Sequence, residues 1–397
     1  MSFLTPQRLT MMVFFLQPIA FGSWLPRIGD VQLSLGLGPS GLALALLGLP
    51  CGTLLTLPFA GPLVGRIGPR AAILIGYVLY TLAMCLPALA LDPTLLFVAL
   101  MLAGSTISFV ELGLNVQADA VEKATGTVIM TTAHGCWSVG IMAGSLVGSG
   151  MAAIGLAPQL AIPLVGVCIL PLALLVASRL PPPAPEPASE ANAQRPRWTP
   201  PSWALLGICC FVFGITMTEG AMADWSAIFL RDALAADAGT VGLGYAVFAA
   251  LVAAGRFGGD SLKRRFGAVV TARICGVLAV LGAGLLYVAP TVPVALLGFA
   301  TIGIGVSVGF PLAVTAAAAL TDRSAASNVA VLSFVALLGF LVGPPVIGFV
   351  AEHTDIRLGI ACLVPVLIAS LALTKRLDPA RGRRLDHNPQ SDIAGVL

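Results

Sequence analysis

Long uncharged, apolar runs separated by short polar turns recur along the whole chain of 397 residues. Each run approaches or exceeds the roughly 20 residues that an α-helix needs to cross a bilayer. The pattern therefore predicts twelve membrane-spanning helices in an all-α membrane protein. Their approximate ranges are 9–28, 40–64, 71–90, 94–121, 128–154, 158–179, 203–230, 240–262, 268–288, 292–320, 327–350 and 358–374.

One polar segment divides these helices into two sets of six. It reads PPPAPEPASEANAQRPRWTPP at residues 181–201, contains eight prolines and has no apolar period. Proline-rich composition of this kind favours an extended, solvated linker. We expect an N-terminal six-helix bundle, a linker, a C-terminal six-helix bundle and a tail, which occupy residues 1–180, 181–202, 203–376 and 377–397.

Composition supports a membrane protein and argues against other classes. Hydrophobic residues make up 58% of the chain and charged residues 10%, whereas soluble domains carry about 25% charged residues. The net charge of +3, without basic and aromatic blocks, gives no reason to expect a nucleic-acid partner. The eight cysteines lack metal-ligand spacing, and no GxxxxGK[ST] nucleotide loop occurs. We expect neither an enzyme nor a bound metal or cofactor.

The basic residues predict the orientation in the membrane. Most of the 21 lysines and arginines fall on the side of the N-terminus, while Arg27, Arg231 and Arg357 lie in loops on the other side. Because basic loops stay in the cytoplasm, both termini and the linker are expected there. Arginine far outnumbers lysine, as in proteins of GC-rich bacteria, so we expect a bacterial inner membrane.

The two halves of the chain carry similar segments. GPLVGRIGPR (61–70) ends the second predicted span and GGDSLKRRFG (258–267) ends the eighth, so Gly68 and Gly267 stand 199 residues apart. Internal duplication around a central linker is typical of transporters whose substrate site lies between two bundles near the bilayer midplane. We therefore expect two pseudo-symmetric bundles.

These features together resemble the major facilitator superfamily over essentially the whole chain. The signature of that family between the second and third spans is roughly G-x-L-a-D-R-x-G-R. Gly65 replaces its aspartate here, and the second copy carries its acid, Asp260, one turn early. The resemblance implies a cytoplasmic gate at these loops. The residues that fit are Gly61, Leu63, Arg66, Gly68 and Arg70 in the first copy and Gly259, Arg265 and Gly267 in the second.

A Glu-x-x-x-Asn motif in the fourth span, Glu111 and Asn115, resembles that of fucose-permease-type sugar/proton symporters. In that family the glutamate is functional. An aspartate accompanies it in the first span, where this chain offers Gln17. The segments EGAMADW (219–225), HGCWSVG (134–140) and GFLVGPPVIG (339–348) resemble a bacterial branch near those permeases.

Glu111 follows eighteen uncharged residues and stands twelve residues before Lys123, about 18 Å from the cytoplasmic end of its helix. An ionised carboxylate near mid-membrane is unfavourable unless it faces a bundle interior or water. Asn115 lies one turn away on the same face, and His134 is expected at a similar height. We interpret them as a cavity-lining proton or substrate site. The alternative is a neutral glutamate hydrogen-bonded to a neighbouring helix.

The seventh span adds two acids, Glu219 and Asp224. They lie about 140° apart around the helix, so we do not expect them to face one ligand together. Glu219 is a candidate for the cavity, and Asp224 is a candidate for an outer gate. The aromatic candidates for the cavity are Trp24, Trp137, Phe109 and Phe310.

Charged residues near the cytoplasmic ends are candidates for an inner gate. Arg256 and Asp260, four residues apart in the eighth span, are expected to form an intrahelical pair or to join this gate with Arg265. Further pairs are expected when the cytoplasmic side is closed. The predicted partners are Arg66 and Arg70 on one side and Asp119 and Glu122 on the other.

Three functions remain open. The first is a monomeric secondary transporter whose bundles rock around a small polar solute, sugar-like or other, with import coupled to protons at Glu111. The second is proton-coupled efflux of amphipathic compounds: Gly140, Gly144 and Gly148 resemble a drug/proton antiporter motif, although Ser145 replaces its proline and the fourth-span arginine motif is missing. The third is a non-transporting sensor or receptor on the same fold.

Overall fold

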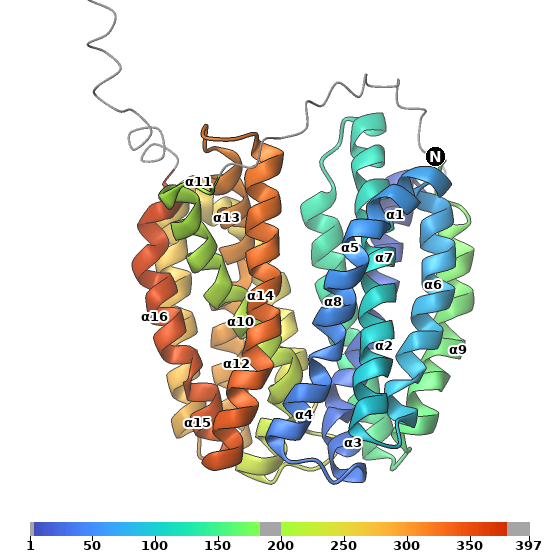
Figure 1. Ribbon diagram of the computed structural model, residues 1–397, viewed down its shortest axis with the longest axis vertical. Coiled ribbons are helices and arrows are strands. Elements are labelled where there is room, and N and C mark those ends of the chain that lie inside the picture. The colour runs from blue at the N-terminus through green and yellow to red at the C-terminus, as the bar shows by residue number, and fades with distance from the viewer. Residues whose placement is uncertain (1–3, 183–199, 379–397) are drawn as a thin grey trace, which may run out of the picture.

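The computed structural model describes residues 4–182 and 200–378, apart from the side chains of Asp260 and Ala326. These residues form helices and no strand. The helices stand side by side in two bundles, one from each half of the chain (Figure 1). The expected linker and tail fall largely outside the described residues.

The N-terminal bundle contains six spans, and the first two are broken into shorter helices. The first span consists of α1 (Pro6–Leu16), α2 (Pro18–Trp24), η1 (Leu25–Arg27) and α3 (Ile28–Ser34), and the second of α4 (Pro39–Leu46) and α5 (Gly48–Ile67). The others are α6 (Pro69–Cys85) with η2 (Pro87–Leu89), α7 (Pro93–Thr125), α8 (Met130–Ala153) and α9 (Pro158–Ala177). Proline opens several of these helices because the first helical position needs no amide donor.

The C-terminal bundle repeats this order. It begins with α10 (Trp203–Leu234) and the long α11 (Leu243–Val288), which holds two spans. The tenth span comprises α12 (Val292–Ser307) and α13 (Gly309–Ala318), and the eleventh is α14 (Ala325–His353). The last comprises α15 (Ile356–Ala361), α16 (Leu363–Leu373) and η3 (Thr374–Leu377).

The helices agree with the predicted spans. Eleven stretches of the described chain are long and apolar enough to cross a bilayer, and a twelfth apolar stretch, Leu243–Gly259, is the first part of α11. These twelve stretches correspond in order to the twelve predicted spans. The expected all-α architecture is therefore confirmed.

The internal repeat extends to the backbone of two glycines. Gly68, between α5 and α6, has φ 81° and ψ 153°, and Gly267, at the bend inside α11, has φ 78° and ψ 165°. A positive φ with extended ψ is a conformation that only glycine adopts readily. Each half thus makes the same turn between its second and third spans.

Two tyrosines stabilise the break in the first span at Gln17. Pro18 supplies no amide proton, so regular helical bonding is interrupted there. The hydroxyl of Tyr80 accepts the amide of Phe21 at 2.9 Å, and the hydroxyl of Tyr77 donates to the carbonyl of Val13 at 2.5 Å. Both tyrosines are buried in α6, and they fix the segment that carries Gln17.

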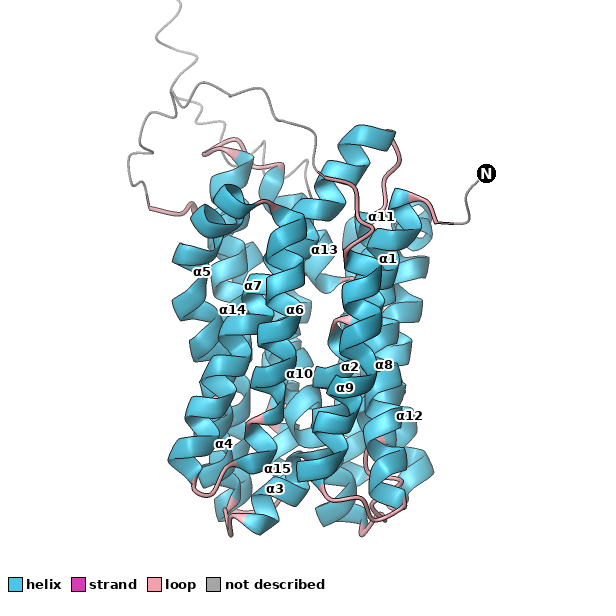
Figure 2. Cartoon of the chain, turned by 90° about the vertical axis from the view of Figure 1, so that its right-hand side faces the viewer, coloured by secondary structure: helices cyan, strands magenta, loops and turns pink. Residues whose placement is uncertain are grey.

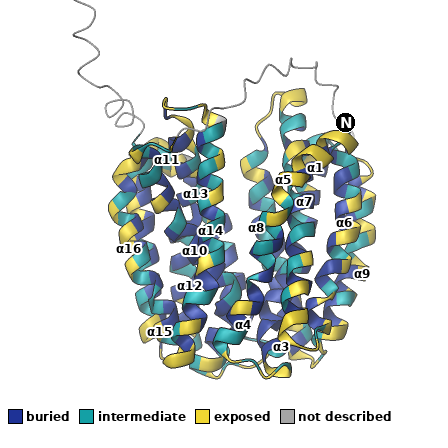
Figure 3. Ribbon diagram, viewed as in Figure 1, coloured by how far each residue is buried: buried dark blue, intermediate teal, exposed yellow. Residues whose placement is uncertain are grey.

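The bundles meet mainly at one end of the molecule. We call the end that carries residues 4, 182, 200 and 378 the terminal end, and the end with loops 35–38 and 235–242 the opposite end (Figures 1 and 2). There α4 packs on α14, and α3 packs on α10; α8 and α11 also run along one another. Buried residues gather between helices while apolar side chains lie exposed around the outside (Figure 3), as expected where lipid surrounds the protein.

Candidate functional site

Three predicted residues of the N-terminal bundle converge near its middle. The indole nitrogen of Trp137 in α8 donates to Oε1 of Gln17 at 2.8 Å. The same side chain lies near the carboxyl group of Glu111, from the middle of α7. Gln17 is almost fully buried. The structure thus gathers an amide, an indole and a carboxyl group from three spans.

Asn115 and His134 meet one turn further along. Nε2 of His134 lies 3.2 Å from Oδ1 of Asn115, so a proton on that nitrogen would make the imidazole the donor. The ring of Phe14 packs edge-on against the imidazole, with centroids 5.3 Å apart. Asn115 and His134 therefore lie at a similar depth along the bundle, as helix geometry predicts.

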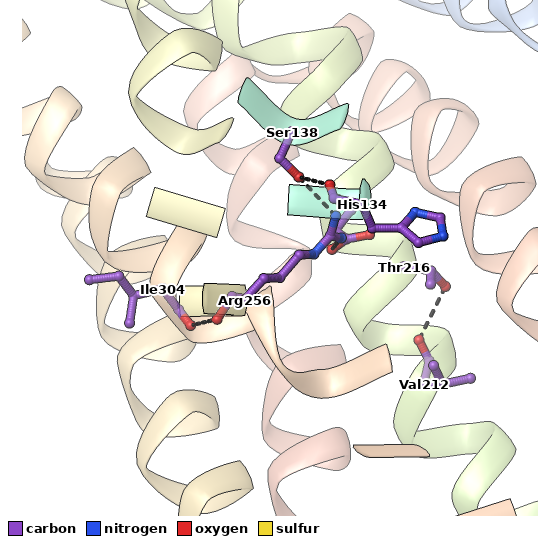
Figure 4. Close-up of polar contacts among 8 residues, drawn as sticks. His134, Ser138, Val212, Thr216, Arg256 and Ile304 are labelled. Carbon is purple, nitrogen blue, oxygen red and sulfur yellow. Dashed lines mark hydrogen bonds and ion pairs between the residues drawn. The ribbon is translucent and has the colours of Figure 1, made fainter. Parts of the chain in front are cut away.

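The wall facing them belongs to the C-terminal bundle. A terminal nitrogen of Arg256 in α11 lies 3.3 Å from Oε1 of Glu219 in α10. The other terminal nitrogen donates to the hydroxyl of Ser138 in α8 at 3.0 Å, and that hydroxyl donates to the carbonyl of His134 at 3.1 Å. Figure 4 shows Arg256 reaching from α11 to Ser138 beside His134. A polar chain therefore crosses between the bundles.

These contacts differ from the expected environment of Arg256. The sequence favoured an intrahelical pair with Asp260 or a place at the inner gate. The structure instead directs the guanidinium to Glu219 and Ser138, because α8 and α10 both pack beside this part of α11. The side chain of Asp260 lies outside the described residues.

Asp224 and Glu219 approach a common neighbour despite their angular separation. The phenol of Tyr245, in the first turn of α11, lies within electrostatic range of both carboxyl groups and of Arg256. Tyr245 and Ser138 were missed by the sequence reasoning. Ser138 follows His134 by one helical turn and could have been found by that spacing, but nothing in the sequence places Tyr245 near α10.

The aromatic candidates divide by burial. Trp24 is 1% exposed and Phe109 is 8% exposed, so both pack among helices. Trp137 and Phe310 are only partly buried. Trp137 also contacts predicted site residues, because its indole nitrogen donates to Gln17 and lies near Glu111.

The predicted inner-gate acids are held within their own bundle in this conformation. Asp119 pairs with Lys123 at 2.7 Å. A carboxylate oxygen of Glu122 accepts the amides of Ile129 and Met130, at 2.5 and 2.7 Å, where α8 begins. On the arginine side, Arg70 donates to the carbonyl of Ser178, Arg265 lies over the ring of Phe266, and Arg66 lies in the last turn of α5. The predicted arginine–acid pairs concern a closed terminal end and remain predictions.

The opposite end is closed by hydrogen bonds between the bundles. Arg231 in α10 donates to the carbonyl of Gly29 at 2.9 Å and to Oε1 of Gln32 at 2.8 Å. The amide of Ser40 donates to Glu352 at 3.1 Å. Among the described residues, Arg231 and Glu352 make these bonds across this end, and Asp224 does not take part in them.

A further bond at this end explains one departure from the antiporter pattern. The hydroxyl of Ser145 in α8 donates to the carbonyl of Gly242 at 3.0 Å. Ser145 is fully buried, and a proline at this position would leave that carbonyl without its donor. The serine therefore serves the contact between the bundles.

Comparison with known proteins places the fold and the sequence in one family. The chain matches the family model of the Major Facilitator Superfamily over residues 9–327 and 225–392. It is similar in structure to the nucleoside transporter NupG, with a TM-score of 0.70, 16% identity and coverage of 94% of this chain and all of that one. It is also similar to an inward-facing bacterial homologue of the human lysosomal transporter Spinster, with a TM-score of 0.69, 14% identity and coverage of 95% and 96%.

Sequence relatives extend over nearly the whole chain. An uncharacterized MFS-type transporter of Yersinia pestis is 30% identical over 371 residues, 92% of this chain and 94% of the relative. An uncharacterized transporter of Sinorhizobium fredii is 31% identical over 380 residues, 93% and 98% of the two chains. Membrane protein MosC of Rhizobium meliloti is 28% identical over 353 residues, 89% and 85%. This chain therefore belongs to the major facilitator superfamily, a family of membrane transporters and not of enzymes.

Proposed function

We propose that this protein is a proton-coupled secondary transporter that moves a small polar solute by alternating access, with Glu111 as the proton site. The observation that carries the proposal is the meeting of polar groups from both bundles near mid-depth. Gln17, Glu111 and Trp137 form one wall, and Glu219 and Arg256 form the other. A solute held between such walls contacts both moving parts, as alternating access requires.

The chemistry at Glu111 supports proton coupling. A carboxylate between apolar helices is unfavourable when ionised and dry, and less so when water reaches it. The indole of Trp137 and the phenol of Tyr80 lie near it, and neither group supplies a positive charge. Opening and closing of the cavity would therefore change how readily Glu111 holds a proton, which links proton movement to the bundles. The Glu-x-x-x-Asn motif suggests a relationship to fucose-permease-type symporters.

The orientation and the conformational state form part of the same proposal. The basic loops support a cytoplasmic location of both termini in a bacterium, which would make the terminal end cytoplasmic and the described conformation inward-facing. The bundles, residues 1–180 and 203–376, act as the two rocking units of a monomer joined by the linker at 181–202. In the outward-facing state, Arg66 and Arg70 would meet Asp119 and Glu122. Impermeant thiol labelling of a linker cysteine from outside intact cells would overturn this orientation.

The test of proton coupling uses purified protein in liposomes. A stability screen of sugars, carboxylates and nucleosides first identifies a ligand, since ligand at about 100 times its dissociation constant adds about 2.7 kcal/mol of stability. Glu111→Gln keeps the shape of the protonated side chain. We expect it to exchange solute across the membrane but to lose accumulation driven by a pH gradient.

The matched control is Glu186→Gln, which makes the same change in the proline-rich segment. This variant should accumulate solute as the wild type does. Wild-type accumulation by Glu111→Gln would overturn Glu111 as the coupling residue and would leave it a structural acid.

A further inference from the structure

Arg256 brings a fixed positive charge into the central site, and its partners among the described residues use only some of its hydrogen-bond donors. A guanidinium has five N–H donors. The bonds to Glu219 and Ser138 use one donor on each terminal nitrogen. Within the described part of the chain, the other three donors make no hydrogen bond. The side chain is 18% exposed, so a ligand can reach it.

The pair with Glu219 is looser than an optimal one. Ionic hydrogen bonds between guanidinium and carboxylate are usually about 2.7–2.9 Å long and often use both oxygens. Here a single oxygen lies at 3.3 Å, and the Glu219 side chain is itself 15% exposed. A second anion can therefore compete for the same guanidinium.

We propose that the transported solute carries an anionic oxygen group, a carboxylate or a phosphate, that binds Arg256 in place of Glu219. When no solute is bound, Glu219 pairs with Arg256 in place of the anionic group and neutralises its charge, because an unpaired buried charge is strongly unfavourable. This inference rests on the proposed transport function and names the chemical class of its solute.

The position of Arg256 explains why such a group would engage both bundles. Ser138 of the N-terminal bundle already touches the guanidinium, and His134 with Asn115 lies directly beyond it. An anionic group on Arg256 with hydroxyls toward these residues would connect α11 to α7 and α8. The acids Glu111 and Asp224 would favour a cationic solute instead, so the test must separate the two charges.

The test measures thermal stability of the purified protein in lipid nanodiscs at pH 7. The probes are sodium acetate and sodium phosphate, with sodium chloride at equal ionic strength as reference and methylammonium chloride as the cation. The variants are Glu219→Gln, Arg256→Gln and the double variant. Acetate distinguishes a carboxylate subsite from one that needs phosphate.

We expect Glu219→Gln to be less stable than the wild type and to be rescued by acetate or phosphate in a saturable way. Half-saturation should need about tenfold less anion than in the wild type, since a hydrogen bond to a charged group is worth at least that factor. The Arg256→Gln and double variants should not respond. Equal responses of all four proteins, no response in any of them, or stabilisation of the wild type by methylammonium alone would overturn the proposal.

A second measurement covers the case in which Glu219→Gln does not fold. Phenylglyoxal modifies accessible arginines, and mass spectrometry can follow Arg256 and the exposed Arg273 separately in the wild type. Acetate or phosphate should slow the modification of Arg256 and leave the modification rate of Arg273 unchanged. If Arg256 is modified at the same rate with and without the anion, the anion subsite is overturned. Neither experiment uses a proton gradient, so failure here is distinguishable from failure of the Glu111→Gln test.

Discussion

The two ends of the molecule differ in how the bundles touch. At the opposite end, Arg231, Glu352 and Ser145 each form a hydrogen bond to the other bundle. At the terminal end, the charged groups of Asp119, Glu122 and Arg70 bond within the N-terminal bundle. The comparison teaches that specific hydrogen bonds join the two bundles at one end, whereas these charged groups at the other end bond within their own bundle.

Local packing reinforces this difference. A Cβ on Gly242 would lie 1.7 Å from Oγ of Ser149 and 2.8 Å from Cβ of Pro26, both in the other bundle. Gly61 and Gly65, near the terminal end of α5, have nothing within 4 Å of an added Cβ. Close packing of the two bundles at Gly242 therefore depends on a residue without a side chain.

The largest expected effect comes from filling that close contact. Gly242→Leu should destabilise the closed opposite end by about 1–3 kcal/mol, the usual range for overpacking. Spin labels at positions 44 and 358, on different bundles at this end, should move apart, and labels at 63 and 262 should approach. The labels are attached to cysteines introduced into a variant that lacks the eight native cysteines.

Gly150→Leu is the matched control. Gly150 lies in α8 at the same end of the molecule as Gly242, and an added Cβ there would have nothing within 4 Å. It should leave both label pairs unchanged. Equal distance changes in the two variants would show that the Gly242 contact does not keep this end closed.

A smaller effect should follow from removing the arginine bonds. Arg231→Gln loses the bonds to Gly29 and Gln32, in both of which the charged guanidinium is the donor. Because the side chain is 23% exposed, water compensates part of the loss, and we expect about 1.5 kcal/mol, the lower end for such bonds. The same label pairs report the shift. Arg273→Gln, an exposed arginine outside this contact, should have no effect, and an unchanged opposite end in Arg231→Gln would contradict the role assigned to these bonds.

The smallest expected effect concerns the loop before Gly242. Asp237 accepts the hydroxyl of Thr240 at 2.7 Å and the amides of Gly239 and Thr240. These bonds, led by that of the Thr240 hydroxyl, hold the pKa of Asp237 below its ordinary value of 3.8. A carboxyl group with a lowered pKa in the folded state stabilises the loop above pH 3.8 and loses that contribution as pH falls through the folded pKa.

Amide exchange protection across residues 235–242 should therefore decrease as pH falls below 3.8 in the wild type. Asp237→Asn keeps an acceptor oxygen but does not titrate, so its protection should be lower at neutral pH and less dependent on pH. Identical profiles for the two proteins would refute the link between Asp237 and the loop.

Much of the architecture could be predicted because membranes make hydrophobic length informative. A helix must satisfy its own backbone in lipid, so each apolar run of sufficient length becomes a span. The eighth span was found from the same pattern, and in the structure it is the part of α11 that precedes the bend at Gly267. The glycines of the repeat, Gly68 and Gly267, were also visible, because only glycine serves a positive-φ turn of this kind.

The candidate site could be predicted only in part. Spacing along one helix placed Asn115 near Glu111, and depth estimates brought His134 to the same level. The partners of Arg256 could not be predicted, because its neighbours come from α8 and α10, 118 and 37 residues away in sequence. Intrahelical spacing favoured Asp260 instead, since sequence alone contains no information about which faces of distant helices meet.

The sequence by itself determined the number of spans, their order and the internal repeat. It also determined that acidic side chains lie at mid-depth, where an ionised carboxylate is unfavourable. These depend on hydrophobic length and on local backbone preferences, which act within one helix. Only the tertiary structure decided that Arg256 joins Glu219 to Ser138, that Tyr245 lies near Glu219 and Asp224, and that Arg231 closes the opposite end. Such contacts depend on how two bundles rotate and pack against each other, and many arrangements of the same amphipathic helices bury the same apolar residues.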